Sequence, residues 1–172
     1  MSFRSLKSYS LASILVGAVF FSSLSAQAAS LIKSFNDWSV FAHEEKPKKI
    51  CFAASQPKTT LPKGVNRDPI YFYVSAWPND GIKTEVSIRL GYPVRTKVPV
   101  RVTIGNKQFS LFAKGDKAYV SDSTEELKLI DAMKKGSTMT VQATSKRGTR
   151  TSDSYSLRGI TSALEGLQKN CS

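Results

Sequence analysis

The stretch that most constrains the fold of this chain is residues 67–93, which contain two strand-like segments around one turn. The first segment, Ile70 to Trp77, is rich in β-branched and aromatic side chains, which favour strands. Pro78 to Gly81 consists of turn-forming residues, and Val86 to Leu90 then alternates apolar with polar side chains. This pattern predicts a hairpin at the centre of an all-β domain.

Short segments before and after this hairpin also alternate apolar and polar side chains, as half-buried strands do. They are residues 35–42, 50–54, 98–104, 107–113, 118–120, 138–145 and 150–157. Residues 56–68, with two prolines and a glycine, instead predict a long exposed connection. About eight or nine short strands of this kind predict a β-sandwich, and a closed barrel is the alternative.

Two segments repeat their apolar side chains at helical spacing. The first is residues 123–135, where either Asp122 or Ser123 can cap the N-terminus, and Ser123 with Glu126 matches a capping box. The second is residues 160–169, a short amphipathic segment. We therefore expect two short helices beside the strands.

The N-terminus has the three parts of a secretory signal peptide. Arg4 and Lys7 form a basic region, residues 11–24 an apolar region, and Ala26-Gln27-Ala28 a small-x-small cleavage site. We expect cleavage before Ala29. An uncleaved anchor helix is the alternative, although the apolar run is shorter than the roughly 20 residues that a bilayer requires.

Cleavage there divides the chain into a signal peptide, residues 1–28, and a mature part, residues 29–172, long enough for one domain. The mature part keeps 23 basic and 13 acidic residues, a formal charge of +10. In an exported protein this charge favours anionic lipid headgroups, lipopolysaccharide phosphates or acidic host glycans over nucleic acid. A solvated surface without a ligand is the alternative. The candidates for a basic binding surface are Lys46, Lys48, Lys49, Lys58, Lys63 and Arg67.

Export also places the mature chain where disulfides persist, and its two cysteines are Cys51 and Cys171. We expect them to be bonded to each other, because an exposed thiol next to the C-terminus would be oxidised. The bond would close a loop of about 120 residues, worth roughly 4–5 kcal/mol on the chain-entropy model. Two free thiols are the alternative.

The residues that usually carry catalysis or bind metals are sparse in this chain. His43 is the single histidine, and no Gly-x-Ser-x-Gly motif accompanies it. One histidine and two distant cysteines do not make a metal ligand set. The paired carboxylates at 44–45 and 125–126 are explained by solubility and helix capping. The sequence therefore predicts no enzyme, no cofactor and no metal site.

The aromatic strand allows two interpretations. Tyr71 and Tyr73 point to one face and Phe72 to the other, so both faces of this strand look apolar. Either one face fills the core while a helix covers the other, or an exposed aromatic row flanked by Arg67, Lys83 and Arg89 binds a ligand.

One set of segments extends over almost the whole mature chain: Trp38–Val40, Lys49–Phe52, Ile70–Pro78, Leu90–Pro93, Glu126–Val141 and Tyr155–Leu164. In their order and spacing these segments resemble the invasion-associated locus B family of exported bacterial proteins. Many members carry a cysteine four residues after the first-strand tryptophan, where this chain has Ala42. By this comparison Cys51 and Cys171 are the one internal pair that can form.

The resemblance implies an immunoglobulin-like β-sandwich in the periplasm, at the outer membrane or secreted. Some family members are linked to host-cell invasion, and none has an established catalytic residue. Taken together, the resemblance and the positive charge predict a non-enzymatic envelope protein that supports host-cell interaction through a basic surface and can associate peripherally with a membrane. The alternatives are a structural or stress-related periplasmic protein without a dedicated ligand and, more remotely, a hydrolytic enzyme.

The signal peptide and the disulfide can be tested together on exported protein. We expect the N-terminal residue to be Ala29, and the intact mass without reductant to lie two hydrogens below that of the reduced chain. N-terminal sequencing and mass spectrometry measure both. A start at Met1, or a full count of two reactive thiols, would contradict the respective prediction.

Overall fold

The computed structural model describes residues 28–45 and 47–171. Lys46 and nearly all of the predicted signal peptide therefore lie outside the described residues. The strands are β1 Ser30–Phe35, β2 Trp38–Glu45, β3 Lys48–Ser55, β4 Thr59–Leu61, β5 Tyr71–Trp77, β6 Ile82–Arg89, β7 Val100–Ile104, β8 Lys107–Lys114, β9 Lys117–Tyr119, β10 Thr138–Thr144 and β11 Arg150–Ser156. The helices are the 3-10 turn η1 Pro78–Asp80 and the α-helices α1 Ser123–Lys135 and α2 Ile160–Asn170.

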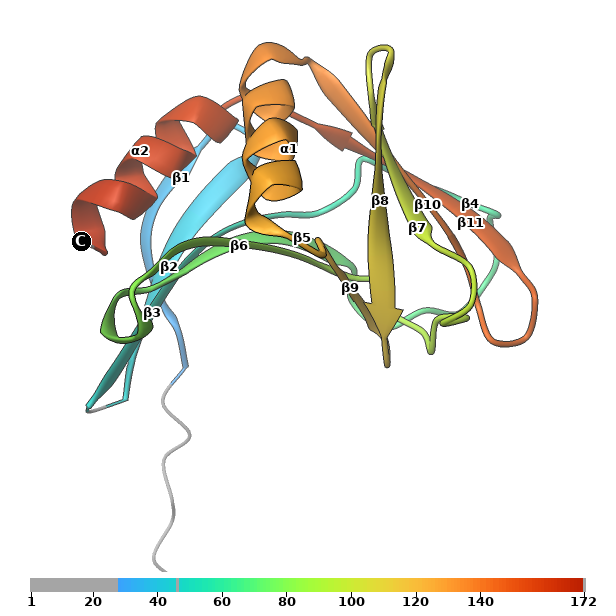
Figure 1. Ribbon diagram of the computed structural model, residues 1–172, viewed down its shortest axis with the longest axis horizontal. Helices are drawn as coiled ribbons and strands as arrows, with labels where there is room; N and C mark the ends of the chain where they lie inside the picture. The colour runs from blue at the N-terminus through green and yellow to red at the C-terminus, as the bar shows by residue number, and fades with distance from the viewer. Residues whose placement is uncertain (1–27, 46, 172) are drawn as a thin grey trace, which may run out of the picture.

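All strand pairs are antiparallel, and the strands follow one another in the order β1-β2-β3-β5-β6-β9-β8-β7-β10-β11-β4. The sheet bends strongly at β8, so its two halves form an arch (Figure 1). We call β1 to β8 in this order the first half-sheet and β8 to β4 the second. The order has two free ends, at β1 and β4, so the fold is an all-β, sandwich-like arrangement rather than the alternative closed barrel.

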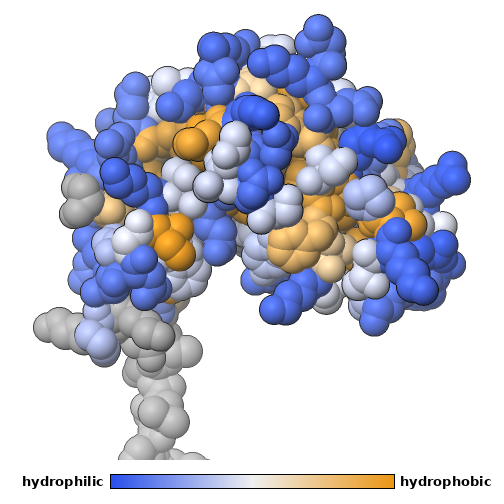
Figure 2. Space-filling view, viewed as in Figure 1, coloured by the Kyte–Doolittle hydropathy of each residue, from blue (hydrophilic) through white to orange (hydrophobic). Residues whose placement is uncertain are grey.

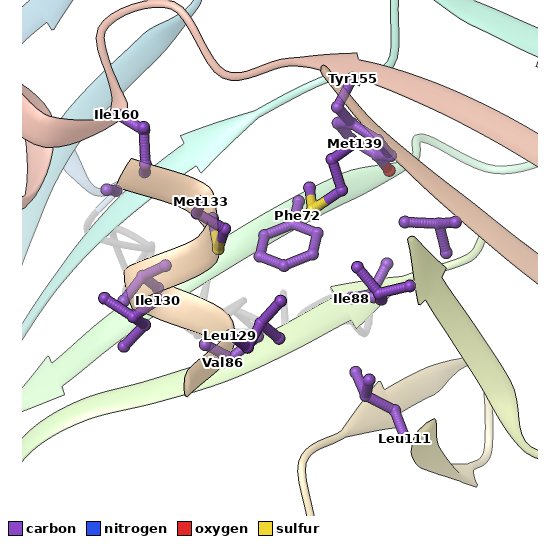
Figure 3. Packing of buried hydrophobic residues seen from close by; sticks show 14 of the residues in the cluster. Phe72, Val86, Ile88, Leu111, Leu129, Ile130, Met133, Met139, Tyr155 and Ile160 are labelled. Atoms are coloured by element: carbon purple, nitrogen blue, oxygen red, sulfur yellow. The ribbon is translucent and has the colours of Figure 1, made fainter. Parts of the chain in front are cut away.

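The core lies between the inner faces of the two half-sheets and the two α-helices (Figure 3). Phe72 of the central hairpin stands at its middle, in edge-to-face contact with Trp38 at 6.0 Å and with Tyr155 at 5.9 Å between ring centroids. All three side chains are fully buried. Because large aromatic side chains bury the most apolar area, this trio joins the first half-sheet to the second.

Helix α1 is held at its start by the first half-sheet. Asp122 is the N-cap and accepts a hydrogen bond from the Glu125 backbone N–H at 2.9 Å. Glu126 does not complete a capping box with Ser123, because its carboxylate accepts from the Thr84 hydroxyl at 2.8 Å and from the Val86 N–H at 2.9 Å. Of the two expected caps, the structure selects Asp122, and Glu126 ties the helix to β6.

Two expectations about strands were wrong. The strand expected at residues 35–42 is two strands, because Asn36 and Asp37 form a tight turn in which Phe35 pairs with Trp38. Asn36 has a φ of 52°, a conformation that asparagine tolerates better than most residues. The connection expected at residues 56–68 contains β4, whose Thr60 pairs with Asp153 of β11. A three-residue edge strand leaves too little alternation to be seen in the sequence.

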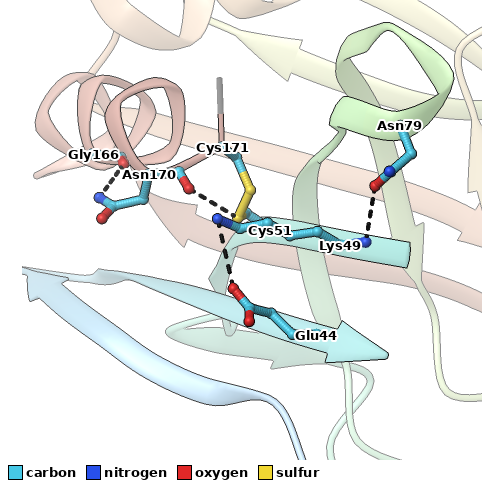
Figure 4. Close-up of a disulfide and its surroundings, with 7 residues drawn as sticks. All are labelled: Glu44, Lys49, Cys51, Asn79, Gly166, Asn170 and Cys171. Carbon is cyan, nitrogen blue, oxygen red and sulfur yellow. Dashed lines mark hydrogen bonds and ion pairs between the residues drawn. A yellow bond between two sulfur atoms is a disulfide. The ribbon is translucent and has the colours of Figure 1, made fainter. Parts of the chain in front are cut away.

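The disulfide between Cys51 and Cys171 is present and joins β3 to the end of α2, with 6.0 Å between the Cα atoms (Figure 4). Both cysteines are buried, and they are 120 residues apart in the chain. The bond thus fixes the last helix against the first half-sheet.

The hydroxyl of Tyr155 is buried without a hydrogen-bond partner among the described residues. Burial raises the pKa of this phenol above its ordinary value, so it stays neutral. Because an unsatisfied buried hydroxyl costs about 1–3 kcal/mol, we expect Tyr155→Phe to leave the free energy of unfolding unchanged or to raise it by about 1 kcal/mol. Urea unfolding measures this change.

The matched control is Tyr92→Phe, because the Tyr92 hydroxyl does have a partner, the Thr151 hydroxyl at 2.5 Å. This substitution should lower the free energy of unfolding by about 1 kcal/mol. Equal destabilisation by the two substitutions would contradict the prediction.

Candidate functional site

A buried ion pair between Arg67 and Asp153 lies where the two half-sheets meet. The two terminal nitrogens of Arg67 donate to the two carboxylate oxygens of Asp153, each at 2.7 Å. The side chains are 6% and 0% exposed, respectively. Arg67 was expected on a basic surface, but its charge is neutralised in the interior, in the two-pronged geometry that makes such pairs strong.

The remaining donors of Arg67 hold the chain after β6. Its Nε and Nη2 donate to the Leu90 carbonyl at 3.1 and 2.7 Å, and its guanidinium lies over the Tyr92 ring, 4.9 Å from the centroid. Only glycine fits at position 91, between Leu90 and Tyr92. A Cβ there would stand 2.3 Å from the Asp68 carbonyl oxygen, and the φ of 74° lies in the left-handed region that favours glycine. The network therefore attaches the connection before β5 to the chain after β6.

The turn between β10 and β11 is fixed beside this network. Its ends are joined by the Ser145 N–H donating to the Thr149 carbonyl at 2.9 Å, and the Ser145 hydroxyl accepts from the Thr149 N–H. The Lys146 N–H donates to the Pro93 carbonyl and the Arg95 N–H to the Thr144 carbonyl, both at 2.9 Å. Since these bonds hold the backbone, the side chains of the turn project from a well-defined position.

Two open depressions lie on either side of this turn. The first, which we call the hairpin pocket, has a volume of about 360 Å³ and includes Asn66, Arg67, Tyr92, Lys146, Arg147 and Thr151 in its wall. The second, which we call the arginine hollow, has a volume of about 610 Å³ and includes Arg95, Arg101, Gln142, Thr144, Arg150 and Thr151. Thr151 belongs to both, so the two depressions adjoin.

Strand register brings the arginines of the hollow together. Arg101 of β7 pairs with Gln142 of β10, and Thr144 of β10 pairs with Arg150 of β11. Paired residues and residues two apart point to the same face of a sheet, so these four side chains share one face. Within residues 28–45 and 47–171, Arg95, Arg101 and Arg150 form no ion pair. The hollow thus carries three positive charges without a compensating carboxylate.

The other basic residues singled out in the sequence lie apart from this surface. Lys49 forms an ion pair with Glu44 at 3.7 Å near the β2–β3 turn (Figure 4). Lys58 pairs with Asp37, whose pKa is held below its ordinary value chiefly by that contact. Lys63 is exposed in the connection after β4. Lys46 and the Lys48 side chain lie outside the described part of the chain.

The arginines of the hollow were missed because no run of basic residues marks them. Arg101 and Arg150 occupy ordinary polar positions of alternating strands, 49 residues apart in sequence. The one signal was the composition of the β10–β11 turn, where Lys146 and Arg147 are adjacent. Only the register between β7, β10 and β11 shows that these charges share a surface.

The aromatic strand uses both faces. Phe72 faces the core, whereas Tyr71 and Tyr73 lie half-buried on the outer face of the first half-sheet. There they join a row of rings, with Phe41 stacked on Phe52 at 5.2 Å and Phe52 in edge contact with Tyr73 at 5.8 Å. The outer rings therefore cover one another across three strands.

His43 lies on β2 opposite Ile50 of β3, away from both depressions described above. Within the described ranges no three His, Cys, Asp or Glu side chains gather closely enough to hold a metal ion. No α-helix in that part of the chain is long and apolar enough to span a membrane.

The described residues thus form a small all-β domain with a buried ion pair, a disulfide and an exposed basic hollow. The chain belongs to the invasion associated locus B (IalB) protein family, whose sequence model matches residues 38–168. A solved structure, the crystal structure of invasion associated protein B from Bartonella henselae, has the same fold. It aligns with a TM-score of 0.57 and 18% identity over 80% of this chain and 97% of that one. No curated protein matches the sequence.

The buried pair makes a testable prediction about stability. We expect Asp153→Asn to lower the free energy of unfolding by about 3–4 kcal/mol, because it leaves the buried Arg67 charge without its counterion. The control is Asp116→Asn, which removes a half-exposed partner 3.3 Å from Arg89 and should cost less than about 1 kcal/mol. Chemical unfolding of both variants measures the difference, and similar losses would contradict a special role for the buried pair.

Proposed function

We propose that this protein is a non-enzymatic exported envelope protein that binds an anionic partner through its basic surface. The observation that carries the proposal is the unneutralised charge beside the β10–β11 turn. There Arg95, Arg101 and Arg150 line one depression and Lys146 and Arg147 the other, without an ion pair among the described residues.

Two further points support this function. Membership of the IalB family, which is named for its association with invasion, suits a protein that contacts a host surface or the bacterial envelope. The formal charge of +10 for residues 29–172 gives a long-range attraction towards anionic surfaces. The partner would be an anionic envelope component or a host surface molecule, reached in the periplasm, at the outer membrane or outside the cell.

A structural periplasmic protein without a dedicated ligand is the competing function. It would need its positive charge only for solubility, and such charge is usually interspersed with acidic side chains. Helix α1 shows that pattern, with Lys128 paired to Glu125 and Lys135 paired to Asp131. The arginine hollow does not, and this contrast favours a ligand.

We expect the mature protein, immobilised through its C-terminus, to retain anionic material from envelope extract at low salt and to release it at high salt. The physical reason is that binding by charge pairing weakens as salt screens the charges. Retained phosphate and acidic sugar are assayed at about 50 and 500 mM salt, a range over which the screening length shortens severalfold. Capture of neutral material only, or capture indifferent to salt, would contradict the proposal.

A further inference from the structure

We propose that the arginine hollow is a binding site for an acidic polysaccharide chain, whose sulfate or carboxylate groups pair with Arg95, Arg101 and Arg150. This inference rests on the proposed function and names its ligand class and its site. Three guanidinium groups without counterions in the described part of the chain supply the charge complementarity. Each can donate two parallel hydrogen bonds to a carboxylate or sulfate, which favours arginine over lysine for such groups.

The uncharged lining of the hollow distinguishes a sugar chain from other anions. Gln142 and Thr144 line the hollow on the same face as Arg101 and Arg150. Their amide and hydroxyl groups both donate and accept hydrogen bonds, as do the hydroxyl groups of a sugar. A polar floor between charged groups therefore matches a glycan along its length.

The same lining argues against a single-stranded nucleic acid or a membrane surface. None of the described residues that line the hollow is aromatic, and stacking on aromatic side chains is the usual way to hold unpaired bases. Its apolar members are small, namely Val98, Pro99 and Ala143, so they offer little surface for insertion among lipid acyl chains.

The size of the hollow indicates a chain rather than a single small anion. Arg101 and Arg150 lie on strands separated by β10 and are offset by two residues, which places their Cα atoms about 12 Å apart. The volume of about 610 Å³ exceeds what one sulfate or phosphate fills. Beyond Thr151, Lys146 and Arg147 in the wall of the hairpin pocket extend the positive surface around the turn. A polyanion can thus contact the three arginines of the hollow together.

The site is rigid enough to bind without reorganising its backbone. Arg101 and Arg150 stand on paired strands, and the Arg95 N–H donates to the Thr144 carbonyl at 2.9 Å. Gly148 has a φ of 96°, and a Cβ there would lie 3.3 Å from the Arg95 guanidinium. A preformed arrangement loses less entropy when a ligand binds.

The part of the arch that carries the β10–β11 hairpin in Figure 1 presents hydrophilic side chains at the surface in Figure 2.

The test measures binding of dextran sulfate to the mature protein, with neutral dextran as the control ligand. The triple variant Arg95→Gln, Arg101→Gln, Arg150→Gln should bind about 50-fold more weakly and with a smaller salt dependence. A matched variant, Lys83→Gln, Lys107→Gln, Lys169→Gln, removes the same charge from exposed lysines that form no ion pair among the described residues. It should lose no more than about threefold.

A second comparison separates recognition from charge. Replacing the three arginines with lysine keeps the charge but removes the planar two-pronged donor, and we expect binding to fall about tenfold. The unfolding midpoint of every variant is checked first. If the triple glutamine variant fails to fold, Arg101→Gln and Arg150→Gln are each tested alone, with a loss of about fourfold expected for each.

The outcomes distinguish this inference from the proposed function. If the wild-type protein binds neither dextran sulfate nor anionic envelope material, both fail. Another outcome is that the wild-type protein binds anionic material while affinity falls equally when the three arginines of the hollow or the three control lysines are replaced with glutamine. In that case the proposed function stands and the hollow is not the site. Binding of phosphatidylglycerol vesicles or of oligothymidylate as tightly as dextran sulfate would overturn the assignment to a polysaccharide.

Discussion

The arrangement of the two half-sheets depends on how the Arg67 charge is buried. An isolated guanidinium in the interior would cost several kcal/mol, so it is stable there only with a counterion and satisfied hydrogen bonds. Asp153 of β11 provides the counterion, and the Leu90 carbonyl accepts two further bonds. Because these partners lie just after β6 and in the middle of β11, one side chain links the two half-sheets and holds the loop before β5 in place.

Much of the fold follows from local pattern. The central hairpin, the strands that alternate in side-chain character and the two helices were predicted close to their observed bounds, because each is set by neighbours in sequence. The disulfide was predicted because two cysteines in a chain that is expected to be exported leave one pairing. The bend of the sheet at β8 and the pairing of β4 with β11 depend on contacts distant in sequence, which periodicity does not report.

At the candidate site, too, the features set by contacts distant in sequence were not predicted. Sequence reasoning looked for charge in loops rich in lysine, and it placed Arg67 there because its neighbours are polar. Its burial depends on Asp153, 86 residues later, a partner that local composition does not indicate. The arginine hollow was missed for the opposite reason: Arg101 and Arg150 are isolated in sequence and meet only through the register of β7, β10 and β11.

The two kinds of arginine differ in what they do for the protein. Arg67 cannot be exchanged without leaving Asp153 as an unpaired buried charge, so its role in stability leaves it little freedom to serve a ligand. The arginines of the hollow stand in water, where a screening length of about 8 Å at physiological salt limits their mutual repulsion to a fraction of a kcal/mol. Folding neither requires these charges nor is much opposed by them. Their concentration on one face is therefore a feature that the proposed binding site accounts for and that folding does not require.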